Sequence, residues 1–234
     1  MRRLANRDRA SDPSAGLLGH HGLREWWDST FSPEEQRFIE SRHQPMGGGL
    51  ATLTDGHISS TSQSAAGLLW VLAGWFNKPG ERHIARRMLA TAEEIATDVV
   101  DRHFVYSQLI DVTYPERERE PGAMDEAIRA CQAQIAIGPA VMAAMRAEQA
   151  DRERFLADRN RDMGRAHQSR AFQAPGHRGF TQLAIIHEKE GNFEAAIALA
   201  EQARALGWTG DWDNRIDRLR KRTNRSATAA ERRR

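Results

Sequence analysis

The segment from His187 to Gly191, read His-Glu-Lys-Glu-Gly, comes nearest to a known catalytic motif. Zinc proteases carry His-Glu-x-x-His on a helix, where two histidines one turn apart hold the metal. Here Gly191 stands where the second histidine belongs. We therefore interpret His187 as a side chain packed inside the protein and not as a zinc ligand.

Four further histidines fall in segments without a regular pattern, and no cluster of acids accompanies them at metal-ligand spacing. The glycines Gly47 to Gly49 lack the Lys and the Ser or Thr of a phosphate-binding loop, so we interpret them as a turn. The four histidines are His20, His21, His43 and His57.

Nucleophilic chemistry is also incomplete. Cys131 is the single cysteine and lies on an apolar seam, which indicates a buried structural thiol. The hydroxyl-rich run from Ser59 to Ser64 precedes a helical pattern, so helix capping explains it better than catalysis. The sequence predicts no catalytic residue, no metal site and no cofactor.

Composition excludes several protein classes. The 234 residues include 28% charged residues, and the mean hydropathy is −0.66. No apolar run approaches the roughly 18 residues of a membrane-spanning helix. The first 15 residues carry arginines but no apolar centre of a secretory signal, so we expect a cytoplasmic protein.

Charge is distributed unevenly along the chain. Residues 1–9 carry +3 and residues 218–234 carry +7, whereas residues 10–217 carry −8. Phosphate binding needs clustered positive charge on a folded face, and here the clusters lie on the termini. Nucleic-acid binding through basic tails is therefore an alternative function and not the favoured one.

The elements that position these residues are helical. Residues 1–22 lack any apolar period and predict a disordered basic arm. Residues 23–61 predict two short helices and a Gly-rich loop, with Ser32 as N-cap and Pro33 as the first helical residue. From residue 62 the apolar residues recur three and four apart, as in packed helices, and no convincing strand alternation occurs.

Two stretches 111 residues apart share one spacing, with equivalent residues at offsets 3, 4, 7, 11, 16, 20 and 23 from the first. Small residues at the paired positions let two helices approach closely, and a glycine ends the first helix. The first stretch reads Leu69, Leu72, Ala73, Phe76, Gly80, Ala85, Leu89 and Ala92, and the second reads Phe180, Leu183, Ala184, His187, Gly191, Ala196, Ala200 and Ala203.

This spacing resembles the tetratricopeptide repeat, a helix-turn-helix unit of 34 residues. A third, damaged copy lies between the two, with Gly122, Ala127, Cys131 and Pro139 at the turn, second-helix and closing-proline positions. Its first helix, around Tyr106 to Thr113, fits only if extra residues enlarge the loop that follows.

The resemblance implies an all-α fold of antiparallel helical hairpins, an α-solenoid with capping helices at both ends. Two hairpins occupy residues 62–140, and a helix with an Arg-rich loop interrupts the array over residues 141–177. A third hairpin and a capping helix occupy residues 178–223, and residues 224–234 form a disordered basic tail.

In this family the first helices of successive repeats line a groove that holds a peptide or a helix of a partner protein. The resemblance places nine residues of this chain in that groove. With an acidic body and Asp111 among them, we expect a basic or mixed peptide as ligand. The nine are Trp70, Asn77, Lys78, Ser107, Asp111, Thr181, Ile185, Glu188 and Lys189.

Six tryptophans are many for this length, and we expect five of them to pack in cores or caps, with Trp70 facing the groove. The favoured function is a non-catalytic protein-interaction module. The least favoured is a small helical enzyme that uses His43 or His57 with Asp55.

Overall fold

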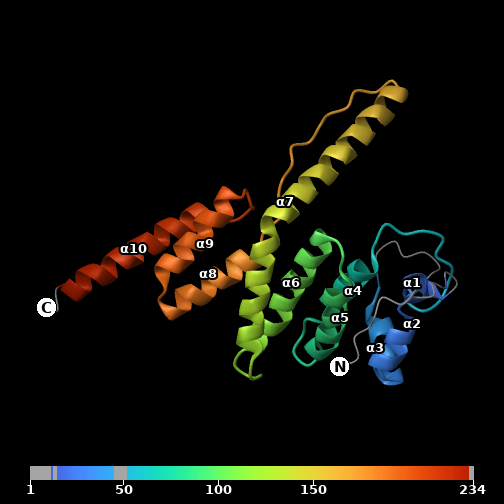
Figure 1. Ribbon diagram of the computed structural model, residues 1–234, viewed down its shortest axis with the longest axis horizontal. Helices are drawn as coiled ribbons and strands as arrows, with labels where there is room; N and C mark the ends of the chain where they lie inside the picture. Colours follow the sequence, from blue (N-terminus) through green and yellow to red (C-terminus); the bar gives the residue numbers. More distant parts are fainter. Residues whose placement is uncertain (1–11, 13–14, 45–51, 232–234) are drawn as a thin grey trace. The chain divides into compact units, whose positions relative to one another are not determined.

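The computed structural model describes residue 12, residues 15–44 and residues 52–231, with side chains described as far as residue 225. Over this part the chain is all-helical, as predicted, and β-structure is limited to two isolated bridges. Figure 1 shows the succession of helices. The chain divides into two compact units, unit 1 over Met1–Ala96 and unit 2 over Thr97–Arg234.

Unit 1 begins with a short helix in the segment predicted to be a disordered arm. Helix α1 spans Gly16–His20, and Leu18 is fully buried. The backbone N–H groups of Leu17 and Leu18 donate to the carbonyls of Thr52 and Leu53. The prediction is wrong for residues 15–22, because these long-range backbone bonds order a segment that has no helical period of its own.

The two predicted short helices are confirmed as α2 over Arg24–Thr30 and α3 over Pro33–Arg42. The Ser32 hydroxyl accepts from the Glu35 N–H, and the Glu35 carboxylate accepts from the Ser32 N–H, which completes a capping box. Arg87 also binds Glu35, so this cap is tied to α5. The predicted Gly47–Gly49 turn lies outside the described residues.

The first repeat-like stretch forms a pair of packed helices in unit 1. Helix α4 spans Ala65–Ala73, a 3-10 turn η1 spans Gly74–Phe76, and α5 spans Arg82–Ile95. Helices α4 and α5 pack together with Ala73 and Ala85 fully buried. Gly80 has φ +84°, a left-handed turn conformation that suits glycine.

The middle copy forms the second pair, in unit 2. Helix α6 spans Val99–Thr113, a 3-10 turn η2 spans Tyr114–Glu116, and α7 spans Ala123–Asp162. The sequence predicted that Pro139 ends this pair, but Pro139 lies inside α7. An interior proline costs roughly 3 kcal/mol, and burial of Val141 and Met142 in the unit 2 core offsets that cost.

The Arg-rich loop that was predicted to follow this helix runs alongside the second half of α7 (Figure 1). His167 and Glu153 are joined through Nε2 and Oε2 at 2.8 Å, and the Arg170 N–H donates to the same carboxylate oxygen at 3.3 Å. These contacts hold residues 167–170 against the helix. The Arg-rich loop is therefore a strap along α7.

The second repeat-like stretch forms the third pair, α8 over Arg178–Glu190 and α9 over Phe193–Ala205. Gly191 ends α8 with φ +80°, as the glycine position of the repeat predicts. Ala184 of α8 and Ala196 of α9 are fully buried in one cluster with Leu219.

The predicted capping helix is longer than the sequence suggested. Helix α10 spans Trp212–Glu231 and packs on α9, burying Trp212, Ile216 and Leu219. The predicted disordered tail from residue 224 is wrong as far as Glu231, where the backbone continues the helix. The run has no Gly or Pro between residues 212 and 231 to end it.

Candidate functional site

The predicted groove residues of unit 1 follow α4. Trp70 is half-buried on that helix, and Asn77 and Lys78 are exposed after η1. Asn77 accepts from Arg82 Nε through its backbone oxygen at 3.0 Å. Trp75 is 41% exposed, so the expectation that all tryptophans except Trp70 are packed inside is wrong for Trp75. It lies beside His43, with ring centroids 5.8 Å apart.

In unit 2 the predicted groove residues lie on two neighbouring helices, α6 and α8, which pack together. Arg178 Nε donates to Asp111 Oδ1 at 2.6 Å across this junction. At the other end Lys189 Nζ donates to the Tyr114 hydroxyl at 3.0 Å. Asp111 and Lys189 therefore join the two helices. The half-buried residues Ser107, Thr181 and Ile185 share these helices.

Glu188 faces a different neighbour. Its carboxylate binds Arg215 and also accepts from Arg218 Nη2 at 2.9 Å, and both arginines belong to α10. The Glu188 side chain is only 14% exposed. This acid therefore attaches α10 to α8 and is occupied by its own chain.

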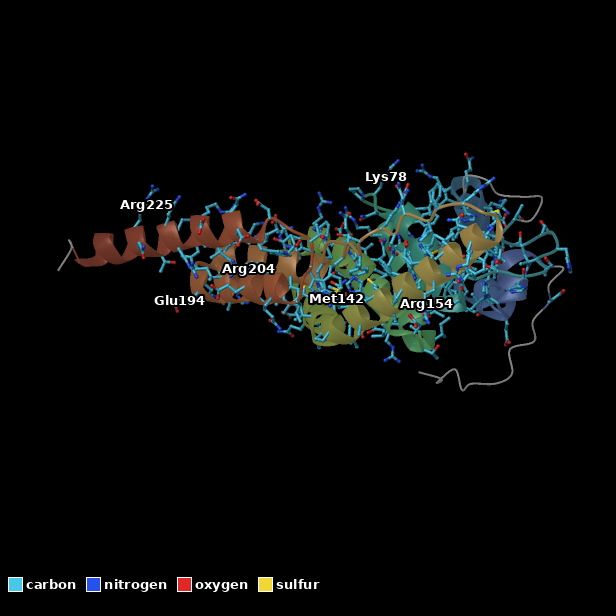
Figure 2. The ribbon with its side chains drawn as sticks, turned by 90° about the horizontal axis from the view of Figure 1, so that it is seen from above. Lys78, Met142, Arg154, Glu194, Arg204 and Arg225 are labelled. Carbon is cyan, nitrogen blue, oxygen red and sulfur yellow. The ribbon has the colours of Figure 1, made fainter. Side chains whose placement is uncertain are left out.

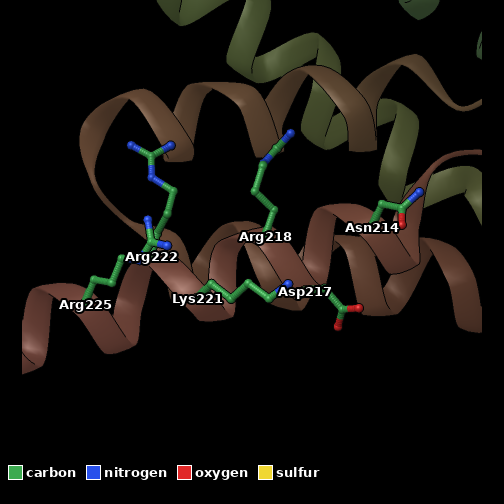
Figure 3. Close-up of a pocket in the computed structure, with 6 residues that line it drawn as sticks. All are labelled: Asn214, Asp217, Arg218, Lys221, Arg222 and Arg225. Carbon is green, nitrogen blue, oxygen red and sulfur yellow. The ribbon is translucent and has the colours of Figure 1, made fainter.

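Helix α10, which Glu188 joins to α8, carries a strip of basic residues. We use the name α10 strip for Arg218, Lys221, Arg222 and Arg225, which are exposed and recur at three- and four-residue spacing on one helix face. Together with Asn214 and Asp217 they line an open, shallow pocket. Figure 3 shows Arg218 and Arg222 extending toward the neighbouring helix, with Lys221 lying along α10.

The cations of the α10 strip differ in how far they are engaged. Arg218 binds Glu188, and the Arg222 guanidinium lies 4.7 Å from the centre of the Phe193 ring. Among the described residues, Lys221 and Arg225 have no ion-pair or hydrogen-bond partner. Figure 2 shows Arg225 projecting outward from α10. With Asp217 as the single acid in the pocket, its lining carries a net charge of +3.

Cys131 lies in the interior of unit 2, near the Arg178–Asp111 pair that joins α6 and α8. Burial raises the pKa of its thiol to about 12, with a smaller opposing effect of Arg178. At neutral pH the group is a thiol and not the thiolate that reacts or binds metal. The interpretation of Cys131 as a buried side chain agrees with its complete burial.

Neither a cluster of metal-binding side chains nor a helix able to span a membrane occurs among the described residues. No group of three or more His, Cys, Asp or Glu side chains in residues 12, 15–44 and 52–231 is placed to hold a metal ion. Across the same residues, the helices lack the combination of length and apolar character that crossing a membrane requires.

Sequence reasoning missed the partners of the groove residues. Arg178 pairs with Asp111 from 67 positions away, and Arg215 pairs with Glu188 from 27 positions away. The α10 strip did leave a signal, since residues 218, 221, 222 and 225 follow a helical period in the sequence. This period was not recognised, because residues 224–234 were predicted to be a disordered tail.

Comparisons of the chain with protein-family models, with curated proteins and with solved structures found no match.

Proposed function

We propose that the chain is a non-catalytic protein-interaction module built from tetratricopeptide-like helix pairs. Two helix-turn-helix pairs have the residue spacing of that repeat, with Ala73 and Ala184 fully buried at the equivalent seam positions. Helices α6 and α7 form a third pair with a longer connection and a longer second helix. The groove used for binding is the face of unit 2 formed by α6, α8 and α10. Its side chains hold and orient a partner without any chemical step.

The ligand that suits this face is an acidic segment of a partner protein. The expectation of a basic or mixed ligand depended on Asp111, whose carboxylate is occupied by Arg178. Glu188 is likewise occupied by α10. The observation that carries the proposal is the pair Lys221 and Arg225, two cations one helical turn apart without partners among the described residues.

The size of the α10 strip sets the size of the ligand. Residues 218 to 225 extend about 10 Å along the helix at 1.5 Å per residue. Lys221 and Arg225, together with Arg218 and Arg222, which are already engaged within the chain, match two or three carboxylates. An acidic helix or extended segment supplies such a set over one or two turns.

A charge reversal tests the proposal. We expect Lys221→Glu together with Arg225→Glu to weaken binding of a fluorescein-labelled Glu-rich 16-residue peptide by about tenfold or more, because two ion pairs become repulsions. Fluorescence anisotropy at two salt concentrations measures the loss. A peptide with Gln in place of Glu serves as the uncharged reference.

The matched control is Arg119→Glu together with Arg165→Glu, which changes the net charge of unit 2 equally at two exposed positions away from α10. We expect this variant to bind like the wild type. Equal weakening by both double variants would mean that overall charge, and not the α10 strip, attracts the peptide.

Nucleic-acid binding is the second candidate, favoured by the same exposed cations on α10. Sites on duplex DNA commonly neutralise six to ten phosphates, roughly twice what the α10 strip offers. A duplex DNA probe in the same assay separates the two candidates. Tighter binding of DNA than of the Glu-rich peptide, lost on deletion of residues 224–234, would favour nucleic acid.

A further inference from the structure

Three buried rings meet inside unit 2. His103 of α6 stacks on Trp208 with centroids 5.3 Å apart, and His177 meets the edges of both rings at 5.0 Å and 4.6 Å. The three residues are between 1% and 2% exposed. Each has a buried ring nitrogen without a hydrogen-bond partner in the described chain: His103 Nδ1, His177 Nε2 and Trp208 Nε1.

The backbone around the cluster is fixed by one side chain. Gln134 of α7 donates through Nε2 to the His103 carbonyl at 2.8 Å and accepts through Oε1 from the Gly179 N–H at 2.6 Å. Helices α6, α7 and α8 are therefore joined at this point. The unpaired nitrogens lie in a rigid junction and not in a mobile surface.

The hydrogen bonds of His177 determine what its unpaired nitrogen can do. His177 is the N-cap of α8, and its Nδ1 accepts from the Phe180 N–H at 3.3 Å. A neutral imidazole that accepts at Nδ1 carries its proton on Nε2. His177 Nε2 is thus a donor, as Trp208 Nε1 always is, and both donors require an acceptor.

Both donors border the same position on α7. A Cβ built on Gly138 would lie 3.6 Å from His177 Nε2 and 3.6 Å from Trp208 Nε1. The next residue is Pro139, which has no N–H, so the carbonyl of Ile135 lacks the helical donor that it would otherwise have. Two donors therefore lie beside a residue without a side chain, one turn from a backbone carbonyl that has no helical donor.

We propose that Gly138 keeps open a binding site for one buried water molecule, which accepts from His177 Nε2 and Trp208 Nε1 and donates to His103 Nδ1. The second water proton is available to the Ile135 carbonyl. A buried water makes about three hydrogen bonds to otherwise unpaired groups, which this set provides. The water joins α7, α8 and the turn that carries Trp208.

Other occupants suit the groups less well. A metal ion needs an unprotonated ring nitrogen, and His177 Nε2 carries the proton. An anion accepts from the two donors but has no proton to donate to His103 Nδ1. Water is the small ligand that both accepts and donates.

Gly138→Ala tests the proposal through the sign of a stability change. An added methyl fits, because 3.6 Å is ordinary van der Waals contact, and alanine is the better helix former. Without a bound water the variant should therefore melt at a higher temperature. We expect a lower melting temperature, because the methyl displaces the water and leaves both donors unpaired. Gly176→Ala, which adds a methyl 3.7 Å from the Thr209 carbonyl oxygen, should melt within a degree or two of wild type.

A crystal structure of the full chain at about 1.5 Å resolution provides the direct measurement and does not depend on a variant folding. We expect one oxygen within hydrogen-bond distance, about 2.7–3.2 Å, of both His177 Nε2 and Trp208 Nε1. Empty density there, an ion in place of water, or a protein acceptor bound by either nitrogen would overturn the proposal, as would a raised melting temperature of the Gly138→Ala variant.

Discussion

At the scale of single residues, the histidines most relevant to stability are not those that first attract notice. His43 and His57 were candidates for an enzyme, yet the most deeply buried are His103 and His177. Burial lowers the pKa of His103 to about 4, and burial together with the neighbouring His103 lowers the pKa of His177 to about 3. Their burial depends on residues far apart in the chain, so no local pattern indicates it.

These shifts predict a dependence of stability on pH. Below the ordinary histidine pKa of 6.5 the unfolded chain binds protons that the folded chain excludes, so the free energy of unfolding falls as the pH falls toward 4. Each group contributes about 2 kcal/mol of loss between pH 7 and pH 5. Urea unfolding at pH 7, 6 and 5 measures the trend.

The matched variant is His177→Asn, which retains a capping side chain at the start of α8 but does not titrate. We expect its free energy of unfolding to fall less steeply between pH 7 and pH 5 than that of the wild type. An identical pH profile would show that His177 is not the group that excludes the proton.

At the scale of elements, the sequence predicted the helices where each has its own start and stop signals. The Ser32 cap of α3 and the Gly191 end of α8 are local, and both are confirmed. The predicted helix end at Pro139 was wrong, because burial of Val141 and Met142 outweighs the local tendency of proline to end a helix. Helix α1 was missed because backbone bonds to residues 52–56 order it.

In the candidate site too, features that depend on local sequence were predicted and features that depend on packing were not. The groove residues of unit 2 lie on the predicted helices, because helical spacing locates them. Their ion pairs with Arg178 and Arg215 join separate helices, and packing alone decides those partners. The sequence therefore predicted which helices carry these residues but not which of their charges are already occupied by other residues of the chain.

The packing of helix α10 predicts the effect of a substitution on the stability of unit 2. Leu219 is fully buried against Ala184 and Ala196, so Leu219→Ala removes a packed side chain that attaches α10 to the third pair. We expect a loss of about 2–4 kcal/mol in the free energy of unfolding of unit 2. Lys221→Ala on the exposed face of the same helix should change it by less than about 0.5 kcal/mol. Similar small losses for both would mean that α10 is not packed as described.

At the scale of the whole molecule, two units with their own buried side chains make up the chain. Within unit 1, hydrogen bonds join Ser32 to Glu35 and Glu35 to Arg87. Within unit 2, Gln134 bonds to the backbone of His103 and Gly179 and so joins helices α6, α7 and α8. The six segments predicted from the sequence did not indicate this division, because they followed composition and the repeat and not contacts between helices.

The division predicts two transitions in scanning calorimetry. Phe76 is fully buried in unit 1, and we expect Phe76→Ala to lower one transition by several degrees while leaving the other in place. Leu219→Ala should affect the opposite transition. A single transition lowered equally by both variants would mean that the two units unfold as one.

The most direct test of the proposed function is hydrogen–deuterium exchange of the full chain with and without the Glu-rich peptide at saturating concentration. The account predicts slower exchange in α8 and α10, with little change in α1 to α5. Slower exchange confined to unit 1, or unchanged exchange throughout under conditions where anisotropy reports binding, would contradict it.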